Sequence, residues 1–510
     1  MRVIEAKHVK TSTVKESADV IVIGSGAGGA VMAYELAAAG KKVLLLEAGP
    51  YVRSSEFNEN YADMFERLFV DKARQTNVDG DISILQGACL GGSTVVNATV
   101  SLRIPDWIVD KWRSEYGVEG IPPSVLASKY ELVEKRLSIH VNQPHEINRN
   151  SQLMKKGCEA LGWSVRPEPR NIKDCALAGY CMAGCRYDRK QSMLVTYVPW
   201  AIEKGAAVYT DTRVETIHVK GGRATGVSAV IRDPMSGDTV ATLEAEGRAV
   251  VLAAGGVQTP LLLLRSGIAN SSGQIGHNFA CHPSLNVVGL FEEEVKGWVG
   301  ALQGVMCDEF GTEEKGAILF QGACPDAYLI NGFTIPGIGP KATDLSKRVS
   351  HIANMVQLTH DESVGRVSWD DGVKKIVYRV GESDKEHMRK GFKAGARIWF
   401  AAGAQQVVLP TIVPMVLKSE NEIDLVDQMP MGPGDMNMVS YHPQGTCRMG
   451  GNPKQSVVNS RGQCHDIPNL VIADTSVFPT SVMVNTQLPV YAIATHFADL
   501  MNAEPDRYFG

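Results

Sequence analysis

The chain lacks a long hydrophobic run of the kind that crosses a membrane as a helix. Two stretches, 398–417 and 475–495, carry no charged residue, but prolines and side-chain amides interrupt both, and a lipid-exposed helix of about 20 residues does not accommodate these easily. The amino terminus breaks every apolar pair with a charged or hydroxyl residue, so it has no hydrophobic segment of a secretory signal. These absences predict a cytoplasmic protein without a transmembrane segment. A peripheral membrane contact through 398–417 stays open.

Cysteine and net charge are also scarce. Ten cysteines in 510 residues indicate reduced thiols and exclude a disulfide framework. With 51 basic and 56 acidic residues, a net charge of −5, no basic field attracts nucleic acid, and no nucleic-acid partner is expected. Repeats of 20–50 residues and low-complexity tracts are missing, which excludes a solenoid. Glycine is abundant instead, at 50 residues, and predicts many tight turns and close backbone approaches.

The first element pattern is a strand, a glycine turn, a helix and a second strand. Residues 19–23 are a short β-branched run, and 24–29 have the sequence GSGAGG. Residues 30–39 are rich in helix formers, and 42–46 are a second apolar run. This order within about 30 residues predicts a Rossmann-like α/β domain that binds a dinucleotide.

The glycines of this turn have separate physical roles. Gly24 makes the tight turn, Gly26 lets the backbone approach a pyrophosphate, and Gly29 lets the helix pack close to the sheet. The helix start offers free N–H groups and the positive end of its dipole to phosphates. Glu47, which follows the second strand, can accept hydrogen bonds from ribose hydroxyls. The fold alone leaves open whether the dinucleotide contains nicotinamide or flavin.

Later segments extend the α/β pattern. Residues 110–137 and 384–404 have amphipathic or mixed helical periodicity. Residues 227–254 are predicted as strands around a turn at 233–237. The last of these strands runs into a second glycine turn and a helix at 259–265, which suits the same sheet.

Four further segments carry a family resemblance. They are GACLGGSTVVN at 87–97, DTRV at 211–214, the run 266–283, and the region from 441 to 487. In this order the sequence resembles the glucose-methanol-choline (GMC) oxidoreductase family over nearly the whole chain, nearest to its alcohol dehydrogenase and long-chain alcohol oxidase branches.

The resemblance implies an α/β flavoenzyme with two domains. A discontinuous Rossmann-like domain, expected at 1–115, 190–285 and 435–510, binds FAD. A second α+β domain, at 116–189 and 286–434, binds the substrate, and its mixed sheet roofs the flavin. Val96 stands where some members carry a histidine bonded to the flavin, so non-covalent FAD is expected.

Residue by residue, the resemblance also assigns the cofactor and substrate contacts. The cofactor contacts are Glu47 at the adenosine ribose, Val214 at the adenine, Gly91, Gly92 and Asn97 along the flavin, and Asp474 beside the pyrophosphate. His442 matches the catalytic histidine, and Asn485 matches the second active-site position. Many members have proline after this asparagine, whereas this chain has Thr486, so the local backbone is free to differ.

The chemistry of alcohol oxidation agrees with this pair. A base must stand within about 3 Å of the hydroxyl oxygen as hydride leaves the carbon, and histidine has the pKa best suited to neutral pH. The sequence therefore predicts His442 as base, with Asn485 donating a hydrogen bond to the oxygen and the flavin accepting hydride. His282 and His496 are interpreted as ordinary core histidines.

The predicted function is FAD-dependent oxidation of a primary or secondary alcohol to an aldehyde or ketone. One alternative is a lyase on the same scaffold, and another is a flavin-binding electron-transfer or structural subunit. A third is an iron–sulfur-linked dehydrogenase subunit that passes electrons to a partner, with Cys175, Cys181 and Cys185 as candidate ligands. Because a fourth local ligand is missing, plain thiols are favoured over a metal centre.

The sequence gives less information about the substrate and the electron acceptor. The apolar stretch 398–417 favours a hydrophobic or aromatic alcohol, and oxygen and another acceptor stay open. The aromatic residues that could line the roof are Phe310, Phe320, Tyr328, Phe333, Trp369 and Trp399, although aromatics at such positions are more often core.

Overall fold

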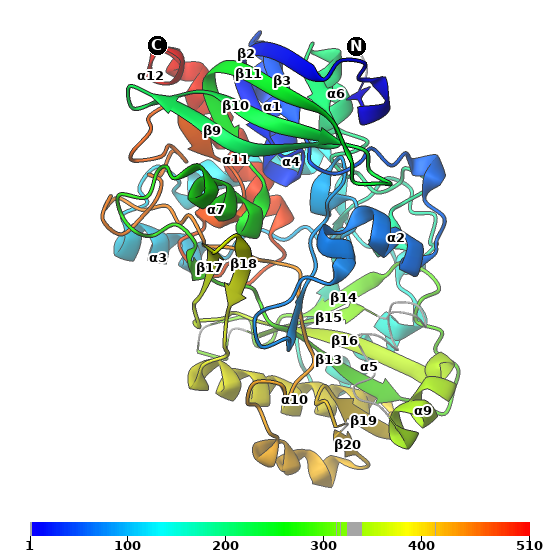
Figure 1. Cartoon of the computed structure of the whole chain (residues 1–510). Helices are drawn as coiled ribbons and strands as arrows, with labels where there is room; N and C mark the ends of the chain where they lie inside the picture. Colours follow the sequence, from blue (N-terminus) through cyan, green and yellow to red (C-terminus); the bar gives the residue numbers. More distant parts are fainter. Residues whose placement is uncertain (1–2, 313, 317, 324–338, 414) are drawn as a thin grey trace.

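Two large β-sheets, one above the other in Figure 1, organise the chain. The computed structural model describes residues 3–312, 314–316, 318–323, 339–413 and 415–510. Both chain ends lie beside the first sheet (Figure 1). None of the described helices is long and apolar enough to span a membrane.

The first sheet has a parallel centre that continues into an antiparallel edge. Its strands are, in spatial order, β1 (Val3–Ile4), β8 (Ala207–Tyr209), β3 (Val43–Leu46), β2 (Thr13–Ile23), β11 (Thr239–Leu252), β10 (Arg223–Arg232) and β9 (Thr212–Lys220), with β22 (Leu470–Ile472) paired to β11. The strands from β1 to β11, and β22, run parallel to their neighbours, whereas β10 and β9 are antiparallel. A mostly parallel sheet needs helices over its faces.

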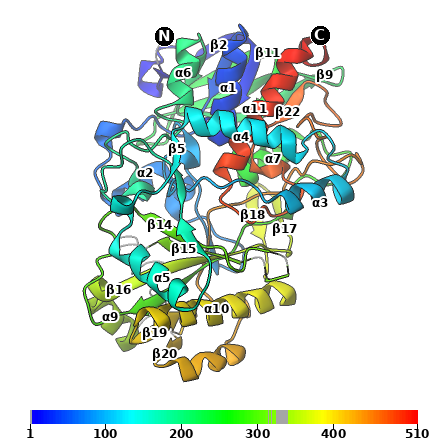
Figure 2. The ribbon, with the colours of Figure 1, turned by 180° about the vertical axis from the view of Figure 1, so that it is seen from behind.

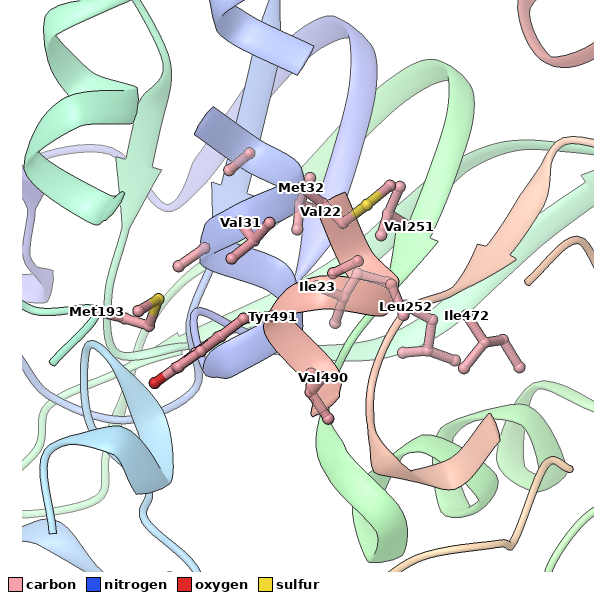
Figure 3. Close-up of a cluster of buried hydrophobic side chains, with 14 of the residues drawn as sticks. Val22, Ile23, Val31, Met32, Met193, Val251, Leu252, Ile472, Val490 and Tyr491 are labelled. Carbon is pink, nitrogen blue, oxygen red and sulfur yellow. The ribbon is translucent and has the colours of Figure 1, made fainter. Parts of the chain in front are cut away.

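Helices α1 (Ala27–Ala38) and α11 (Gln487–Ala503) supply one such cover and pack against each other. Figure 3 shows side chains of both helices meeting those of β2, β11 and β22 in one buried cluster. Helices α4 (Pro123–Arg136) and α6 (Tyr197–Glu203) pack on the outside of this pair (Figure 2). Strand β22 and helix α11, near the carboxyl end of the chain, therefore complete a layer that β2 and α1 begin near its amino end.

The second sheet is built mainly from antiparallel strands. Its spatial order is β20 (Met415–Leu417), β19 (Gln406–Leu409), β13 (Ser284–Leu290), β16 (Ile352–Thr359), β15 (Ile318–Ala323), β14 (Gln303–Cys307) and β6 (Val165–Pro167). In addition, β21 (Met438–Ser440) pairs with β13, and β4 (Ile82–Ile84) pairs with β21. Helices α5 (Arg149–Ala160) and α10 (Glu382–Ala402) pack on the face away from the first sheet (Figures 1 and 2).

Smaller elements join the two sheets and cover their edges. They are β12 (His277–Phe279), β17 (Gly365–Asp370) and β18 (Val373–Val377) in a three-stranded sheet, the pair β5 (Ile139–Val141) and β7 (Pro169–Asn171), and helices α2 (Tyr61–Leu68), α3 (Asp106–Tyr116), α7 (Gly255–Ser266), α9 (Pro340–Lys347) and α12 (Pro505–Phe509). The predicted domain boundaries stay a prediction, since β4 and β21 fall in ranges assigned to the FAD-binding domain yet hydrogen-bond into the second sheet.

Candidate active site

A cavity of 620 Å³ lies where the first sheet faces the second. Its walls include the glycine turn at one side, Val214 from β9, and His442 and Asn485. The predicted cofactor and catalytic residues that line it are Gly24, Gly26, Glu47, Gly92, Asn97, Val214, His442, Asp474 and Asn485. Segments from both ends and the middle of the chain thus meet at one space.

The glycine turn leads from β2 into α1. Gly24 has a left-handed φ of +94°, and a Cβ on it would lie 2.4 Å from the carbonyl oxygen of Ala253. A Cβ on Gly29 would lie 1.8 Å from the carbonyl oxygen of Gly24, within the turn itself. Gly26, the N-cap of α1, differs because a Cβ there would meet only the Cα of Gly92, at 4.0 Å. Gly26 therefore leaves open space next to the helix start, as a phosphate group requires.

Two buried carboxylates flank this turn. Glu47 accepts hydrogen bonds from the amide and hydroxyl of Ser25, at 2.9 and 2.6 Å, and from the amide of Gly49 at 2.8 Å. Asp474 accepts from the amide of Gly255 at 2.8 Å and from the Thr259 hydroxyl at 2.5 Å. Burial raises the pKa of both carboxyl groups, and these hydrogen bonds act against the rise.

The 87–97 segment forms another wall. Gly91 and Gly92 have left-handed φ angles of +95° and +56°. Gly92 lines the cavity, whereas Gly91 lies behind it and donates its amide to the Ser25 hydroxyl at 2.9 Å. Asn97 donates to Oε1 of Gln487 at 2.8 Å, which joins this segment to the start of α11. Val96 is buried and lines the cavity.

His442 and Asn485 come together at the wall formed by the second sheet. The Nε2 atom of His442 lies 3.5 Å from Nδ2 of Asn485. Gln321 of β15 donates to Oδ1 of Asn485 at 2.8 Å and accepts from Nδ2 of Asn485 at 3.4 Å. Burial lowers the pKa of His442 to about 4, so the imidazole is neutral at physiological pH.

His282, which sequence reasoning interpreted as an ordinary core histidine, contacts His442 directly. Its Nδ1 lies 3.2 Å from Nδ1 of His442, and its Nε2 accepts the backbone N–H of Met483 at 3.0 Å. Both His282 and Met483 have left-handed φ angles, +47° and +63°, a conformation that costs about 1–2 kcal/mol for a residue with a side chain. Strained residues of this kind cluster at functional sites. His496, by contrast, contacts the carbonyl of Gly120 and does not line the cavity.

The aromatic residues expected at the roof have other positions. Trp369 lines the cavity but stacks beside Arg265, 5.4 Å from its guanidinium, near β9. Phe310 and Phe320 contact each other, and Trp399 donates its indole N–H to the carbonyl of Val287. None of these three lines the cavity in the described part of the chain. Tyr328 and Phe333 lie outside the described residues.

Carboxamides line the roof instead. Asn286, Gln303, Gln321 and Asn354 come from four adjacent strands of the second sheet. Leu302, Val356 and Leu358 lie among them. Sequence reasoning missed this set because a strand pattern shows that two faces differ but does not say which one borders a cavity.

The cysteine cluster is connected to the 87–97 segment, and its described side chains are not arranged to bind a metal. Cys175, Cys181 and Cys185 are free thiols, and in the described part of the chain no three His, Cys, Asp or Glu side chains are arranged to bind a metal. The buried Lys190 donates to the carbonyls of Asn97 and Cys181, at 2.9 and 2.7 Å. Burial lowers the pKa of Lys190 to about 8. The cluster therefore has a structural connection to the 87–97 segment.

Comparison with known proteins identifies the family. Sequence profiles described as GMC oxidoreductase match residues 18–284 and 361–494. The chain belongs to the GMC oxidoreductase family. It is 31% identical to an uncharacterised GMC-type oxidoreductase of Mycobacterium tuberculosis, over 94% of this chain and 75% of the relative.

Relatives with named activities act on alcohols. The chain is 28% identical to the long-chain-alcohol oxidase FAO4A of Arabidopsis thaliana, over 95% of this chain and 68% of the relative. It is 26% identical to a 2-methyl-1,2-propanediol dehydrogenase of Mycolicibacterium austroafricanum, over 96% of each chain. Among solved structures, pyridoxine 4-oxidase from Mesorbium loti has the same fold, with a TM-score of 0.69 and 18% identity over 94% of this chain and 98% of that chain.

Family membership makes this GMC oxidoreductase an FAD-dependent enzyme that acts on CH–OH donors. The residues present fit that cofactor. Gly26 leaves the helix start of α1 open to the cavity, and Glu47 and Val214 border the same space. The neutral His442 then faces the cavity from the second sheet.

Proposed function

We propose that this enzyme oxidises an alcohol whose hydroxyl oxygen lies against Nε2 of His442 and Nδ2 of Asn485. The observation that carries the proposal is the 3.5 Å approach of these two nitrogens on the wall of the dinucleotide cavity. When bound, FAD supplies the acceptor for the hydride that leaves the carbinol carbon. We assign its pyrophosphate to the open helix start at Gly26, and its adenosine ribose to Glu47.

The role of His442 depends on which ring nitrogen carries its proton. An unprotonated Nε2 would take the hydroxyl proton, which is the base role that the sequence predicts. A protonated Nε2 would donate to the oxygen and stabilise negative charge on it. The hydrogen bonds of His282 favour one of these two roles, as argued for the imidazole pair below.

The roof supports an alcohol that carries a second polar group. Four carboxamides border the substrate side of the cavity, and Oε1 of Gln303 and Oδ1 of Asn354 have no hydrogen-bond partner although they are buried. A buried amide oxygen without a donor is unfavourable, so a second hydroxyl on the substrate would improve the site once these side chains turn toward it. The leucine and valine side chains between them suit a short hydrocarbon part. A compact diol therefore fits better than the hydrophobic or aromatic alcohol favoured by sequence.

Anaerobic mixing of the holoenzyme with an alcohol panel tests the proposed function. We expect a 1,2-diol to bleach the flavin absorbance, and His442→Gln to slow bleaching by about 10²-fold while the FAD content stays unchanged. A flavin that stays oxidised with every alcohol contradicts the proposal and favours a lyase or a binding subunit. Comparing hydrogen peroxide yield with dye reduction then identifies the electron acceptor.

A further inference from the structure

We infer that His282 is a positioning residue that keeps the proton of neutral His442 on Nε2, so that His442 meets the alcohol oxygen as a hydrogen-bond donor and not as a base. The inference rests on the proposed function for its chemistry. Its structural part concerns only the two imidazoles and can be tested separately.

The donor and acceptor roles in this chain of hydrogen bonds can be assigned from one end. That end is a backbone amide, which can only donate. The N–H of Met483 points at Nε2 of His282 at 3.0 Å, so this nitrogen is an acceptor and the neutral ring carries its proton on Nδ1. That proton faces Nδ1 of His442 at 3.2 Å. Nδ1 of His442 is therefore the acceptor, and the proton of neutral His442 is on Nε2, toward the cavity.

The surroundings hold the His282 ring in this orientation. Its side chain has no solvent-exposed surface. The carboxylate of Asp361 accepts the backbone amides of Cys281 and His282, at 2.8 and 3.2 Å, and the Ser481 hydroxyl at 2.7 Å. Asp361 thus ties the segment before His282 to the segment before Met483. A ring clamped at its backbone and at Nε2 has little freedom to reverse the direction of its hydrogen bonds.

Asn485 completes a pair of donors. Gln321 donates to Oδ1 of Asn485 at 2.8 Å and accepts from its Nδ2 at 3.4 Å, and the same Nδ2 lies beside His442. Two donor atoms, Nε2 of His442 and Nδ2 of Asn485, then lie 3.5 Å apart and cannot satisfy each other. An oxygen with negative charge that contacts both nitrogens would accept two hydrogen bonds, which is the arrangement of an oxyanion site.

The proton balance follows from this assignment. The hydroxyl bond of the alcohol breaks, its proton passes to hydroxide from the solvent, and water forms. The electron pair stays on the alkoxide oxygen, which accepts from the two nitrogens. The alkoxide is the form from which hydride leaves the carbon most readily, so His442 contributes by stabilising it.

Other titratable groups lie near the imidazole pair, and their effects on the pH dependence must be distinguished from those of the pair. They are Asp361 and His360 before β17, Tyr378 after β18, Cys281 before β13, and Tyr441 beside His442. Burial raises the pKa of Asp361 to about 6 and lowers the pKa of His360 to about 4. Burial also raises the pKa of the tyrosines and the thiol. A pH effect near 6 therefore belongs to Asp361.

NMR of the holoenzyme labelled with [15N]histidine tests the tautomer without any turnover. One-bond 1H–15N correlations identify the protonated nitrogen of each ring, and His442→Gln assigns the signals of His442. We expect a proton on Nε2 of His442 and on Nδ1 of His282 at pH 7.5. A proton on Nδ1 of His442 overturns the inference, whatever the enzyme oxidises.

Kinetics of three variants test the consequence. His282→Leu removes the donor and should lower kcat/KM for an alcohol about 10–100-fold at unchanged FAD content. His282→Asn can place an amide N–H near the former Nδ1 and should recover activity to within about fivefold of the wild type. His496→Gln, at a histidine remote from the site, is the matched control and should change nothing.

The pH dependence of kcat/KM distinguishes a His442 that donates a hydrogen bond from a His442 that acts as a base. If His442 is a donor, kcat/KM of the wild type should keep rising between pH 7 and 9, because hydroxide takes the proton of the alcohol hydroxyl. A plateau across that range, or a His282→Leu variant as active as the wild type, contradicts the inference. If no alcohol is oxidised at all, the proposed function fails, and the NMR result still decides the tautomer.

Discussion

Gly26 and Gly29 are three residues apart but differ in what an added methyl group would meet. At Gly26 a Cβ would enter open space, whereas at Gly29 it would lie 1.8 Å from a carbonyl oxygen. We expect Gly26→Ala to fold normally and to bind FAD at least about tenfold more weakly, because the methyl group occupies the phosphate position. We expect Gly29→Ala to destabilise the apoprotein by about 1–3 kcal/mol or more through overpacking.

Thermal unfolding of the apoproteins and FAD titration measure the two effects. The glycine pair forms its own control, since each substitution adds one methyl group to the same turn. If Gly26→Ala binds FAD as tightly as the wild type, the phosphates do not lie at this helix start.

A second prediction concerns His360 and the stability of the fold in acid. Burial lowers the pKa of His360 to about 4 from its ordinary 6.5, and its Nδ1 has no hydrogen-bond partner. Above pH 6.5 the ring is neutral in both the folded and unfolded chain. As the pH falls from 6.5 to about 4, only the unfolded chain takes up this proton, so the free energy of unfolding decreases.

Replacing this histidine should remove its share of the acid sensitivity. We expect His360→Gln to reduce the loss of unfolding free energy between pH 7 and pH 4 by up to about 3 kcal/mol, at 1.36 kcal/mol per pKa unit. Urea unfolding of both proteins at several pH values measures it. The raised pKa of Asp361 acts in the opposite direction in both proteins, so it cancels in the comparison. Equal losses in the two proteins would contradict the burial of a neutral ring at His360.

At the scale of elements, local patterns predicted strands and helices best where turn residues bound them. The strand at 19–23 lies within β2, the helix at 30–39 largely overlaps α1, and the strand at 42–46 matches β3 within a residue. The turn at 233–237 separates β10 from β11 as expected. The helical region 110–137 is two helices, because Gly117 ends α3 in a left-handed conformation and Pro122 precedes α4.

The site was predictable only where a motif marked it. The motif regions of the resemblance include His442 and Asn485, and both line the cavity, while their catalytic roles stay a prediction. The partnership of His282 with His442 had no local signal, because 160 residues separate them and the contact depends on how β13 and β21 pair. The polar roof was missed for the same reason, since the period of a strand predicts two faces but not their neighbours.

The two faces of the second sheet lead to a prediction on specificity. Strands β13–β16 present carboxamides to the cavity and apolar side chains such as Met355 to the core beneath α10. We expect Gln303→Leu to lower kcat/KM for a 1,2-diol about fivefold relative to the 1-alkanol of the same length, because one hydrogen bond near 1 kcal/mol is lost. Met355→Leu, on the opposite face, should leave the ratio unchanged. A ratio that Gln303→Leu also leaves unchanged would contradict a polar roof.

At the scale of the molecule, we expect FAD to bind in the cavity between the two sheets without a covalent bond to the chain. Val96 borders the cavity and has no nucleophilic atom, so we expect acid or heat to release intact FAD, with a colourless polypeptide left behind. Because FAD binds the folded chain only, its removal should lower Tm, and added FAD should restore Tm in a concentration-dependent way. A yellow denatured polypeptide, or a Tm independent of FAD, would contradict this.

The place of β22 and α11 in the first sheet has a consequence for biosynthesis. A ribosome makes these elements long after β2 and α1, yet β22 pairs with β11 and α11 packs on α1. Until they emerge, the nascent polypeptide exposes the apolar flank of its opening Rossmann unit and lacks Asp474 and Asn485. A cell must therefore keep the partly made, flavin-free polypeptide from aggregating until both elements have emerged, and a stop codon ahead of β22 would yield a protein that cannot mature.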